Sequence, residues 1–310
     1  MNRSESAHDD TVLVVGSGPA GAMAAAQLVG RGLKVTLLDA GLSAPKGLVV
    51  RAGGNTVLRW KDMRFLENDR HDHTPGAVTD WPSSRSLGGL TNYWTAAVPR
   101  FAPEDFTEGR HLDERYEWPV SYTDLVPYYE KAEAALVVTA GQPFSNFPEN
   151  TVRYRCRPPD DWADLAARAE PSGHHLGPLP MAKGCPWMVA ARGTEFNSYH
   201  SIVAPLLSSD LFTLVRGAQV TRLNWNKGEQ RVESVDYIDR ATRQLTTMRG
   251  RAVVLAAGAV DTTTILLRSV SAEFPHGVGN SRGLVGRYLH DHPREWWPAS
   301  PAQPMRALAH

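Results

Sequence analysis

Gly16-Ser17-Gly18-Pro19-Ala20-Gly21 is the stretch that determines the fold of this 310-residue chain. The apolar run Val12–Val15 precedes it and predicts a buried strand, and the alanine-rich run Ala20–Val29 predicts a helix. A second run, Lys34–Leu38, predicts a strand that delivers Asp39 at its end. The glycines permit a sharp turn, leave room for a pyrophosphate and let the helix pack closely on the sheet. The sequence therefore predicts a βαβ unit that binds a dinucleotide.

Asp39 lies about 20 residues after the glycines, where a carboxylate can accept hydrogen bonds from ribose hydroxyls. An acid at this place would repel a 2′-phosphate, and the helix N-terminus would face the pyrophosphate. The alternative is a glycine-rich turn without a ligand, which the strand, the helix and the terminal acid together disfavour. Both NAD and FAD bind to such a unit, so the rest of the chain must distinguish them.

The composition predicts a globular protein without a strong net electrostatic field. Lys plus Arg and Asp plus Glu number 33 each, so the formal net charge is zero, which disfavours nucleic acid and anionic membranes as partners. Cys156 and Cys185 form no CxxC pattern and are typical of ordinary thiols in a reducing compartment. Residues 1–10 lack the apolar core of a signal peptide, and no run approaches a membrane span. We therefore expect a cytoplasmic protein that binds neither nucleic acid nor a membrane.

A less regular lobe interrupts the α/β pattern. A helix is predicted over residues 122–138, with Ser121 or Thr123 as its cap. Residues 117–210 are rich in Pro and Trp and show no second βαβ pattern, so we interpret them as an insertion.

Strand-like runs return after the insertion. Four of them predict an antiparallel meander, and they cover residues 211–215, 219–225, 231–238 and 244–248. A buried strand over Ala252–Ala259 and a helix over residues 261–269 then indicate a return to the strand–helix pattern of a parallel sheet. The predicted fold class is α/β, with a Rossmann-like parallel sheet, a meander and an inserted lobe.

Four separated stretches share a pattern with one known family. They are the glycine turn with Asp39, the glycine-pair segment Arg85–Trp94, the strand Val253–Gly258, and the segment Val285–Pro293. In this order they resemble the glucose-methanol-choline (GMC) family of FAD-dependent oxidoreductases, although residues 120–210 resemble it much less. The resemblance implies a FAD-binding domain in two parts, residues 1–118 and 212–310, with a substrate or cap lobe over 119–211.

The resemblance implies FAD as the cofactor, bound without a covalent bond. Some relatives attach FAD through a histidine, and Tyr93 stands at that place here. The pyrophosphate would lie on the glycine turn, the ribose on Asp39 and the adenine against the backbone of Val220. The predicted cofactor-binding residues are Gly16, Gly18, Pro19, Ala20, Gly21, Asp39, Ala40, Arg85, Gly88, Gly89, Asn92, Tyr93, Trp94, Val220, Ala257 and Gly258.

The glycine-pair segment has a physical interpretation of its own. Gly88 and Gly89 let a backbone press against a flat ring, and Asn92 can donate and accept hydrogen bonds beside it. Tyr93 and Trp94 either stack on a ring or fill the core, and core filling is favoured.

The reaction implied by the resemblance is oxidation of a CH–OH group of a sugar, polyol or other small alcohol, with hydride passing to the flavin. The family's proton-accepting histidine pair lies well beyond the Asp-His-Pro segment, whereas this sequence stops at His310, so no catalytic base is assigned and we expect a truncated chain. Two alternatives stay open: a FAD-binding subunit that needs a second chain, and an NAD-dependent dehydrogenase. His290-Asp291-His292 precede a proline in a predicted loop without a third ligand, so we expect no metal site.

Overall fold

The computed structural model describes residues 10–44, 83–92, 94, 96–140, 148, 154–155, 160–174, 176–177, 179–183 and 196–290. These residues belong to two compact units. The first unit holds residues 10–44, 83–92 and 197–290, and the second holds Phe196 and the described residues from 94 to 183. The chain changes unit at Trp94 and Asn197, whereas the sequence analysis placed the lobe at residues 119–211.

Local contacts explain these points of change. The Trp94 ring packs on Phe196 with centroids 5.7 Å apart, and Ala97 bridges to Met181, all within the second unit. Asn197 and Ser198 instead hydrogen-bond to Asn92 and Thr91 in the first unit.

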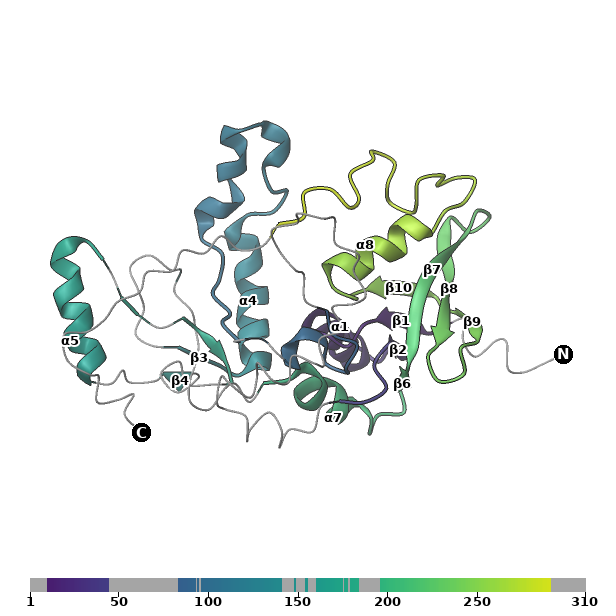
Figure 1. Ribbon diagram of the computed structural model, residues 1–310, viewed down its shortest axis with the longest axis horizontal. Coiled ribbons are helices and arrows are strands. Elements are labelled where there is room, and N and C mark those ends of the chain that lie inside the picture. Colours follow the sequence, from purple (N-terminus) through teal and green to yellow (C-terminus); the bar gives the residue numbers. More distant parts are fainter. Residues whose placement is uncertain are drawn as a thin grey trace, which may run out of the picture. The chain divides into compact units, whose positions relative to one another are not determined.

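A parallel sheet forms the centre of the first unit (Figure 1). Its strands are β1 (Val12–Val15), β2 (Val35–Asp39), β6 (Phe212–Arg216) and β10 (Ala252–Leu255), in the order β10-β1-β2-β6. Every residue of β1 and β2 is buried, as expected for central strands covered on both faces. The predicted strands on either side of the glycine turn are confirmed.

Two helices begin directly after neighbouring strands of this sheet. Helix α1 (Pro19–Gly30) follows β1 and α8 (Ala259–Arg268) follows β10. Proline at the first helical position suits α1, because an N–H there would have no intrahelical partner. The predicted strand over 252–259 is wrong beyond Leu255, since Ala256–Gly258 form the turn into α8.

The antiparallel meander has three strands: β7 (Ala218–Asn226), β8 (Arg231–Asp239) and β9 (Leu245–Arg249), in that order. The prediction of a fourth strand from residues 211–215 is wrong, because β6 pairs in parallel with β2. Gly217, with φ +70°, turns the chain between β6 and β7. Strand β6 provides hydrogen-bond partners for the side of β2 that faces away from β1. The strand that β6 pairs with is therefore determined by its position in the fold and not by the apolar pattern of β6 itself.

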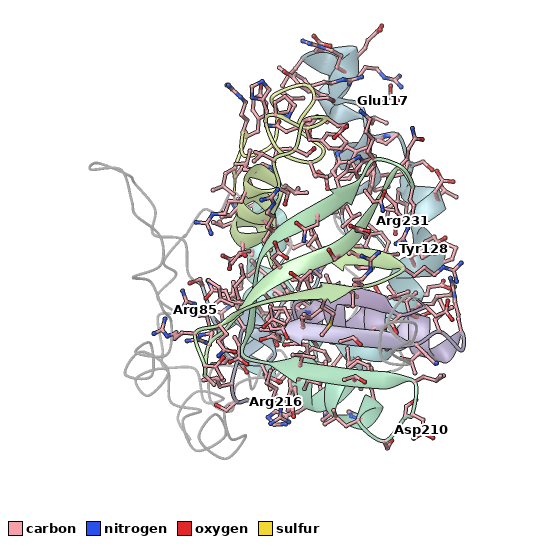
Figure 2. The ribbon with its side chains drawn as sticks, turned by 90° about the vertical axis from the view of Figure 1, so that its right-hand side faces the viewer. Arg85, Glu117, Tyr128, Asp210, Arg216 and Arg231 are labelled. Atoms are coloured by element: carbon pink, nitrogen blue, oxygen red, sulfur yellow. The ribbon has the colours of Figure 1, made fainter. Side chains whose placement is uncertain are left out.

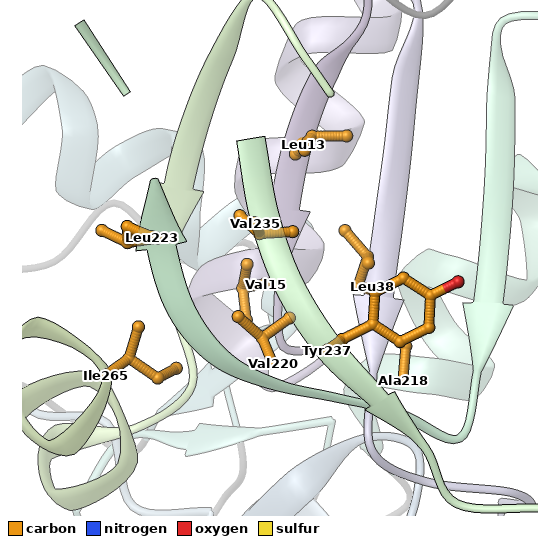
Figure 3. Close-up of a cluster of buried hydrophobic side chains, with 9 residues drawn as sticks. All are labelled: Leu13, Val15, Leu38, Ala218, Val220, Leu223, Val235, Tyr237 and Ile265. Carbon is orange, nitrogen blue, oxygen red and sulfur yellow. The ribbon is translucent and has the colours of Figure 1, made fainter. Parts of the chain in front are cut away.

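The core of the first unit lies between the parallel sheet and the meander (Figure 3). Leu13 and Val15 are two residues apart on β1, so both point to the same face, where Val235 of β8 meets them. The full cluster is Leu13, Val15, Leu38, Ala218, Val220, Leu223, Val235, Tyr237 and Ile265.

The second unit is built around helix α4 (Tyr122–Leu136). Ser121 caps it in a capping box with Asp124, which confirms Ser121 over Thr123, and Val137 ends it at φ 50°. The remaining elements are β3 (Val138–Ala140), β4 (Tyr154–Arg155), β5 (Met181–Ala182) and α5 (Asp160–Ala169). Short single turns are η4 (Pro103–Phe106), η5 (Glu108–His111), η6 (Glu114–Tyr116) and η7 (Glu170–Ser172).

Three short elements complete the first unit: η3 (Gly89–Asn92), the π-helix η9 (Tyr199–Val203) and α7 (Ala204–Leu206). The π-helix packs against α1. Within the described part of the chain, no helix has the length and apolar character needed to cross a bilayer.

Candidate cofactor-binding site

Two helix N-termini lie next to each other at one edge of the parallel sheet. Strands β1 and β10 pair with Val15 opposite Leu255, so the N-cap residues of the helices that follow, Gly18 and Gly258, come from adjacent strand ends. In the described residues, neither helix end has a side-chain cap. Both N-cap residues are glycines without a side chain, and both helix dipoles favour negative charge there, although Asp261 places a carboxylate in the first turn of α8.

Among the described residues, no atom fills the space beside the two N-cap glycines. A Cβ atom added to Gly18 or to Gly258 would meet no described atom within 4 Å. Pro19 and Ala20 are exposed at the start of α1. These glycines thus leave room at the place where the sequence predicts a pyrophosphate.

Gly16 and Gly21 have the opposite surroundings. Gly16 adopts φ +100°, and a Cβ there would overlap the Ala256 carbonyl group. A Cβ on Gly21 would overlap the carbonyl oxygen of Gly16 and lie 3.2 Å from the Ala256 side chain. Both positions allow close packing of the turn, the helix and β10.

Asp39 ties together the turns that follow β1 and β2. Its Oδ2 accepts from the backbone N–H of Ser17 at 2.7 Å, and its Oδ1 accepts from that of Gly41 at 2.6 Å. Burial raises the pKa of the Asp39 carboxyl, while hydrogen bonds from Ser17 and Gly41 and the charge of Arg240 oppose this shift. Each carboxylate oxygen keeps a second lone pair that can accept from a ribose hydroxyl. The ribose contact itself stays a prediction.

Two arginines lie beside this acid. Arg240 donates from Nη1 to the carbonyl oxygen of Ala40 at 2.8 Å. Arg216 (Figure 2) lies opposite Asp39 in the register of β2 and β6, and it donates from Nη2 to the Tyr199 hydroxyl at 3.1 Å. The carbonyl of Ala40, a predicted cofactor residue, is therefore already engaged by Arg240.

The glycine-pair turn, residues 85–92, is fixed by its own side chains. Gly88 and Gly89 have φ +95° and +54°. Asn92 donates from Nδ2 to the carbonyl oxygens of Leu87 at 3.1 Å and Gly89 at 2.8 Å, and its Oδ1 accepts from the Asn197 amide. Asn92 thus holds the turn in shape, and its predicted place beside a flavin ring stays a prediction.

The other predicted residues occupy different surroundings. Trp94 is half-buried in the second unit and donates from Nε1 to the Phe196 carbonyl at 3.3 Å, so it fills space there. Val220 is buried in the core on an edge strand of the meander, and Ala257 donates its N–H to Thr262 Oγ1 at 3.1 Å. Arg85 is half-buried in the glycine-pair turn (Figure 2), and Tyr93 lies outside the described residues.

Sequence reasoning missed four polar side chains of this region. Ser17 occupies a variable place of the glycine motif, Asn197 hydrogen-bonds to Asn92 across 105 residues of sequence, and Ser198 hydrogen-bonds to Thr91 across 107. No local pattern marks such partners. Among the described residues, no group of three or more His, Cys, Asp and Glu side chains could hold a metal ion.

Comparisons with known proteins find relatives of this chain. The chain is 31% identical over 300 residues to paromamine 6'-oxidase of Streptomyces fradiae, which covers 90% of this chain and 53% of that protein. It is 27% identical to 2-methyl-1,2-propanediol dehydrogenase of Mycolicibacterium austroafricanum, covering 93% of this chain and 56% of that one. The chain thus spans about half the length of these curated relatives.

A solved structure shares the fold, and a family description covers most of the sequence. Pyridoxine 4-oxidase from Mesorbium loti superposes with a TM-score of 0.57 at 18% identity, over 84% of this chain and 52% of that one. The description GMC oxidoreductase matches residues 11–294. This chain therefore belongs to the GMC oxidoreductase family.

Proposed function

We propose that this chain is the FAD-binding part of an oxidoreductase that oxidises a CH–OH group of a sugar, polyol or other small alcohol. Family membership implies FAD. The observation that carries the proposal is the pair of uncapped helix N-termini at Gly18 and Gly258, both of which face open space in the described structure. A diphosphate is the ligand that two adjacent helix N-termini suit best.

The residues present fit this cofactor. Backbone N–H groups of Ala20 and Gly21 would bind the pyrophosphate, since Pro19 has no N–H, and Asp39 would accept from the ribose. The backbone at Gly88 and Gly89 would lie along the isoalloxazine. When bound, FAD supplies the hydride acceptor, and the protein supplies position and electrostatics.

The substrate class rests on the relatives. The names of two of them state oxidation of paromamine and dehydrogenation of 2-methyl-1,2-propanediol. Both compounds carry CH–OH groups. We propose a substrate of the same chemistry for this chain, and we assign no proton acceptor to any described residue.

We also keep a second hypothesis, a FAD-binding subunit. In this reading the chain binds FAD but oxidises alcohol only with a second chain that supplies the proton acceptor. The NAD-dependent alternative loses its support, because the GMC family match spans the glycine turn and the meander alike.

A cofactor-loading experiment tests both readings. The full chain is incubated with FAD, desalted and examined for flavin absorbance, then precipitated with acid. We expect retained flavin that acid releases into the supernatant, because Tyr93 cannot form the histidyl bond of some relatives. Flavin that stays with the precipitate would contradict non-covalent binding, and no retained flavin would contradict the proposed function.

Anaerobic addition of substrates then separates the two readings. Bleaching of the flavin absorbance by paromamine or 2-methyl-1,2-propanediol supports an active oxidoreductase. Retained flavin that no alcohol bleaches supports the FAD-binding subunit.

A further inference from the structure

A buried cluster of three hydroxyl groups joins segments that are far apart in the sequence. Ser17 belongs to the glycine turn and Thr91 to the glycine-pair turn. Ser198 is the residue directly before η9. Their exposed fractions are 0%, 4% and 0%. Since a buried hydroxyl without a partner costs about 1 to 3 kcal/mol, the hydrogen bonds of such a cluster fix its geometry.

Ser198 is the centre of this cluster. Its Oγ lies 2.8 Å from the carbonyl oxygen of Ser17 and 3.1 Å from that of Gly88. Its backbone N–H donates to Thr91 Oγ1 at 3.0 Å, and Thr91 Oγ1 donates to the Gly88 carbonyl at 2.5 Å. Because the Thr91 hydroxyl already donates to the Gly88 carbonyl, Ser198 donates its single hydroxyl proton to the carbonyl oxygen of Ser17. Ser198 thus bonds both turns at once.

The cluster continues to the buried acid. The N–H of Gly88 donates to Ser17 Oγ at 2.8 Å, and the backbone N–H of Ser17 donates to Asp39 Oδ2 at 2.7 Å. The glycine-pair turn, the glycine turn and Asp39 are therefore linked by one continuous set of hydrogen bonds.

The two turns also touch. A Cβ on Gly89 would lie 3.5 Å from the Cα of Gly18, which is the residue whose open side faces the proposed pyrophosphate. A small shift of the glycine-pair turn would therefore change the space at Gly18.

We infer that Ser198 is a positioning residue that sets the separation of the glycine turn and the glycine-pair turn, and through it the affinity for FAD. The inference rests on the proposed function. Ser198 is fully buried and would not touch the cofactor, so it acts through Ser17 and Thr91. Fixing two binding segments before the ligand arrives lowers the cost of ordering them on binding.

The test compares two buried serines of the first unit in the full chain. Ser198→Ala should raise the FAD dissociation constant roughly tenfold, equivalent to about 1.4 kcal/mol, and should alter the visible spectrum of bound flavin. Ser269 is the matched control: it is 1% exposed, accepts from the Leu223 N–H at 2.8 Å and donates to the Ile265 carbonyl at 2.6 Å. It lies at the far end of α8 from Gly258, so Ser269→Ala should lower thermal stability and leave the dissociation constant and spectrum unchanged.

A second pair of variants keeps or removes one hydroxyl. Thr91→Val preserves the side-chain shape and loses the hydroxyl, so it should weaken FAD binding as Ser198→Ala does. Thr91→Ser keeps the hydroxyl and should bind FAD within about twofold of wild type, which is about 0.4 kcal/mol. Equal FAD affinity in wild type, Ser198→Ala and Thr91→Val would overturn the inference.

Hydrogen exchange without FAD separates this inference from the proposed function. Ser198→Ala should increase exchange in peptides that cover residues 16–21 and 83–92, and Ser269→Ala should not. A wild-type chain that binds no FAD refutes the proposed function, and the exchange data then decide the coupling of the turns. Unchanged exchange of both peptides in Ser198→Ala would overturn it.

Discussion

Replacement of Gly18 by valine separates the need for space from the need for close packing. The added Cβ meets no described atom within 4 Å, and Gly18 has φ −60°, which any residue can adopt. The new side chain would extend into the region in front of α1. The fold should therefore accept the change, whereas the proposed pyrophosphate should not.

The two costs can be estimated from the structure. Gly18 is the N-cap of α1, and exchange of an N-cap glycine for an aliphatic residue costs about 1 kcal/mol of unfolding free energy. Blocking the approach of the diphosphate to the backbone should raise the FAD dissociation constant at least about a hundredfold, or about 2.8 kcal/mol. Gly16→Ala should instead damage the apo protein, because φ +100° and the overlap with the Ala256 carbonyl add strain.

Flavin titration and chemical unfolding of the full-length variants measure both quantities. Gly30→Val is the matched control, since Gly30 ends the same helix and an added Cβ there also meets no described atom within 4 Å. We expect Gly30→Val to bind FAD as wild type does. Wild-type FAD affinity in Gly18→Val, or a loss of its apo fold as severe as in Gly16→Ala, would refute the reasoning.

Three further predictions concern charge and the core. Burial raises the pKa of Asp39, so the difference in unfolding free energy between wild type and Asp39→Asn should be constant below about pH 4 and should fall as the pH rises through the raised pKa. Urea unfolding at a series of pH values measures this difference, and a difference independent of pH would contradict the prediction. Glu133 forms a two-point ion pair with Arg100, at 2.7 and 2.8 Å, with side chains only 9% and 4% exposed. Glu133→Gln should therefore cost about 3 to 5 kcal/mol in chemical unfolding, whereas Glu117→Gln, in an exposed pair, should cost no more than about 1 kcal/mol, and equal losses would refute this. Leu38→Ala, at a fully buried core position, should cost about 2 to 5 kcal/mol, against less than about 0.5 kcal/mol for Leu245→Ala at 68% exposure; equal melting temperatures would contradict that core.

Elements that depend on nearby residues could be predicted from the sequence. The apolar run before Gly16, the alanines after it and the acid at the end of the next strand give β1, α1 and β2 within one residue of the structure. Ser121 was one of the two predicted caps, and its partner Asp124 is only three residues away. These features carry their own geometric signal.

Features that depend on distant partners could not be predicted. The pairing of β6 with β2 joins residues that are more than 170 positions apart, and an apolar strand does not show which neighbour it will have. The hydrogen bonds of Ser198 cross 181 residues to Ser17 and 107 to Thr91. Asp39 was predicted from its position alone, and its two backbone donors became visible only when the turns were in place.

The most direct test of the central claim is calorimetric titration of the full chain with FAD, repeated with NAD and with the Gly18→Val variant. The claim is that two adjacent helix N-termini, at Gly18 and Gly258, bind the diphosphate of FAD. We predict that one FAD binds per wild-type chain, that NAD does not displace it and that Gly18→Val abolishes the binding heat. Absence of binding heat with FAD, or equal binding by wild type and Gly18→Val, would contradict the claim.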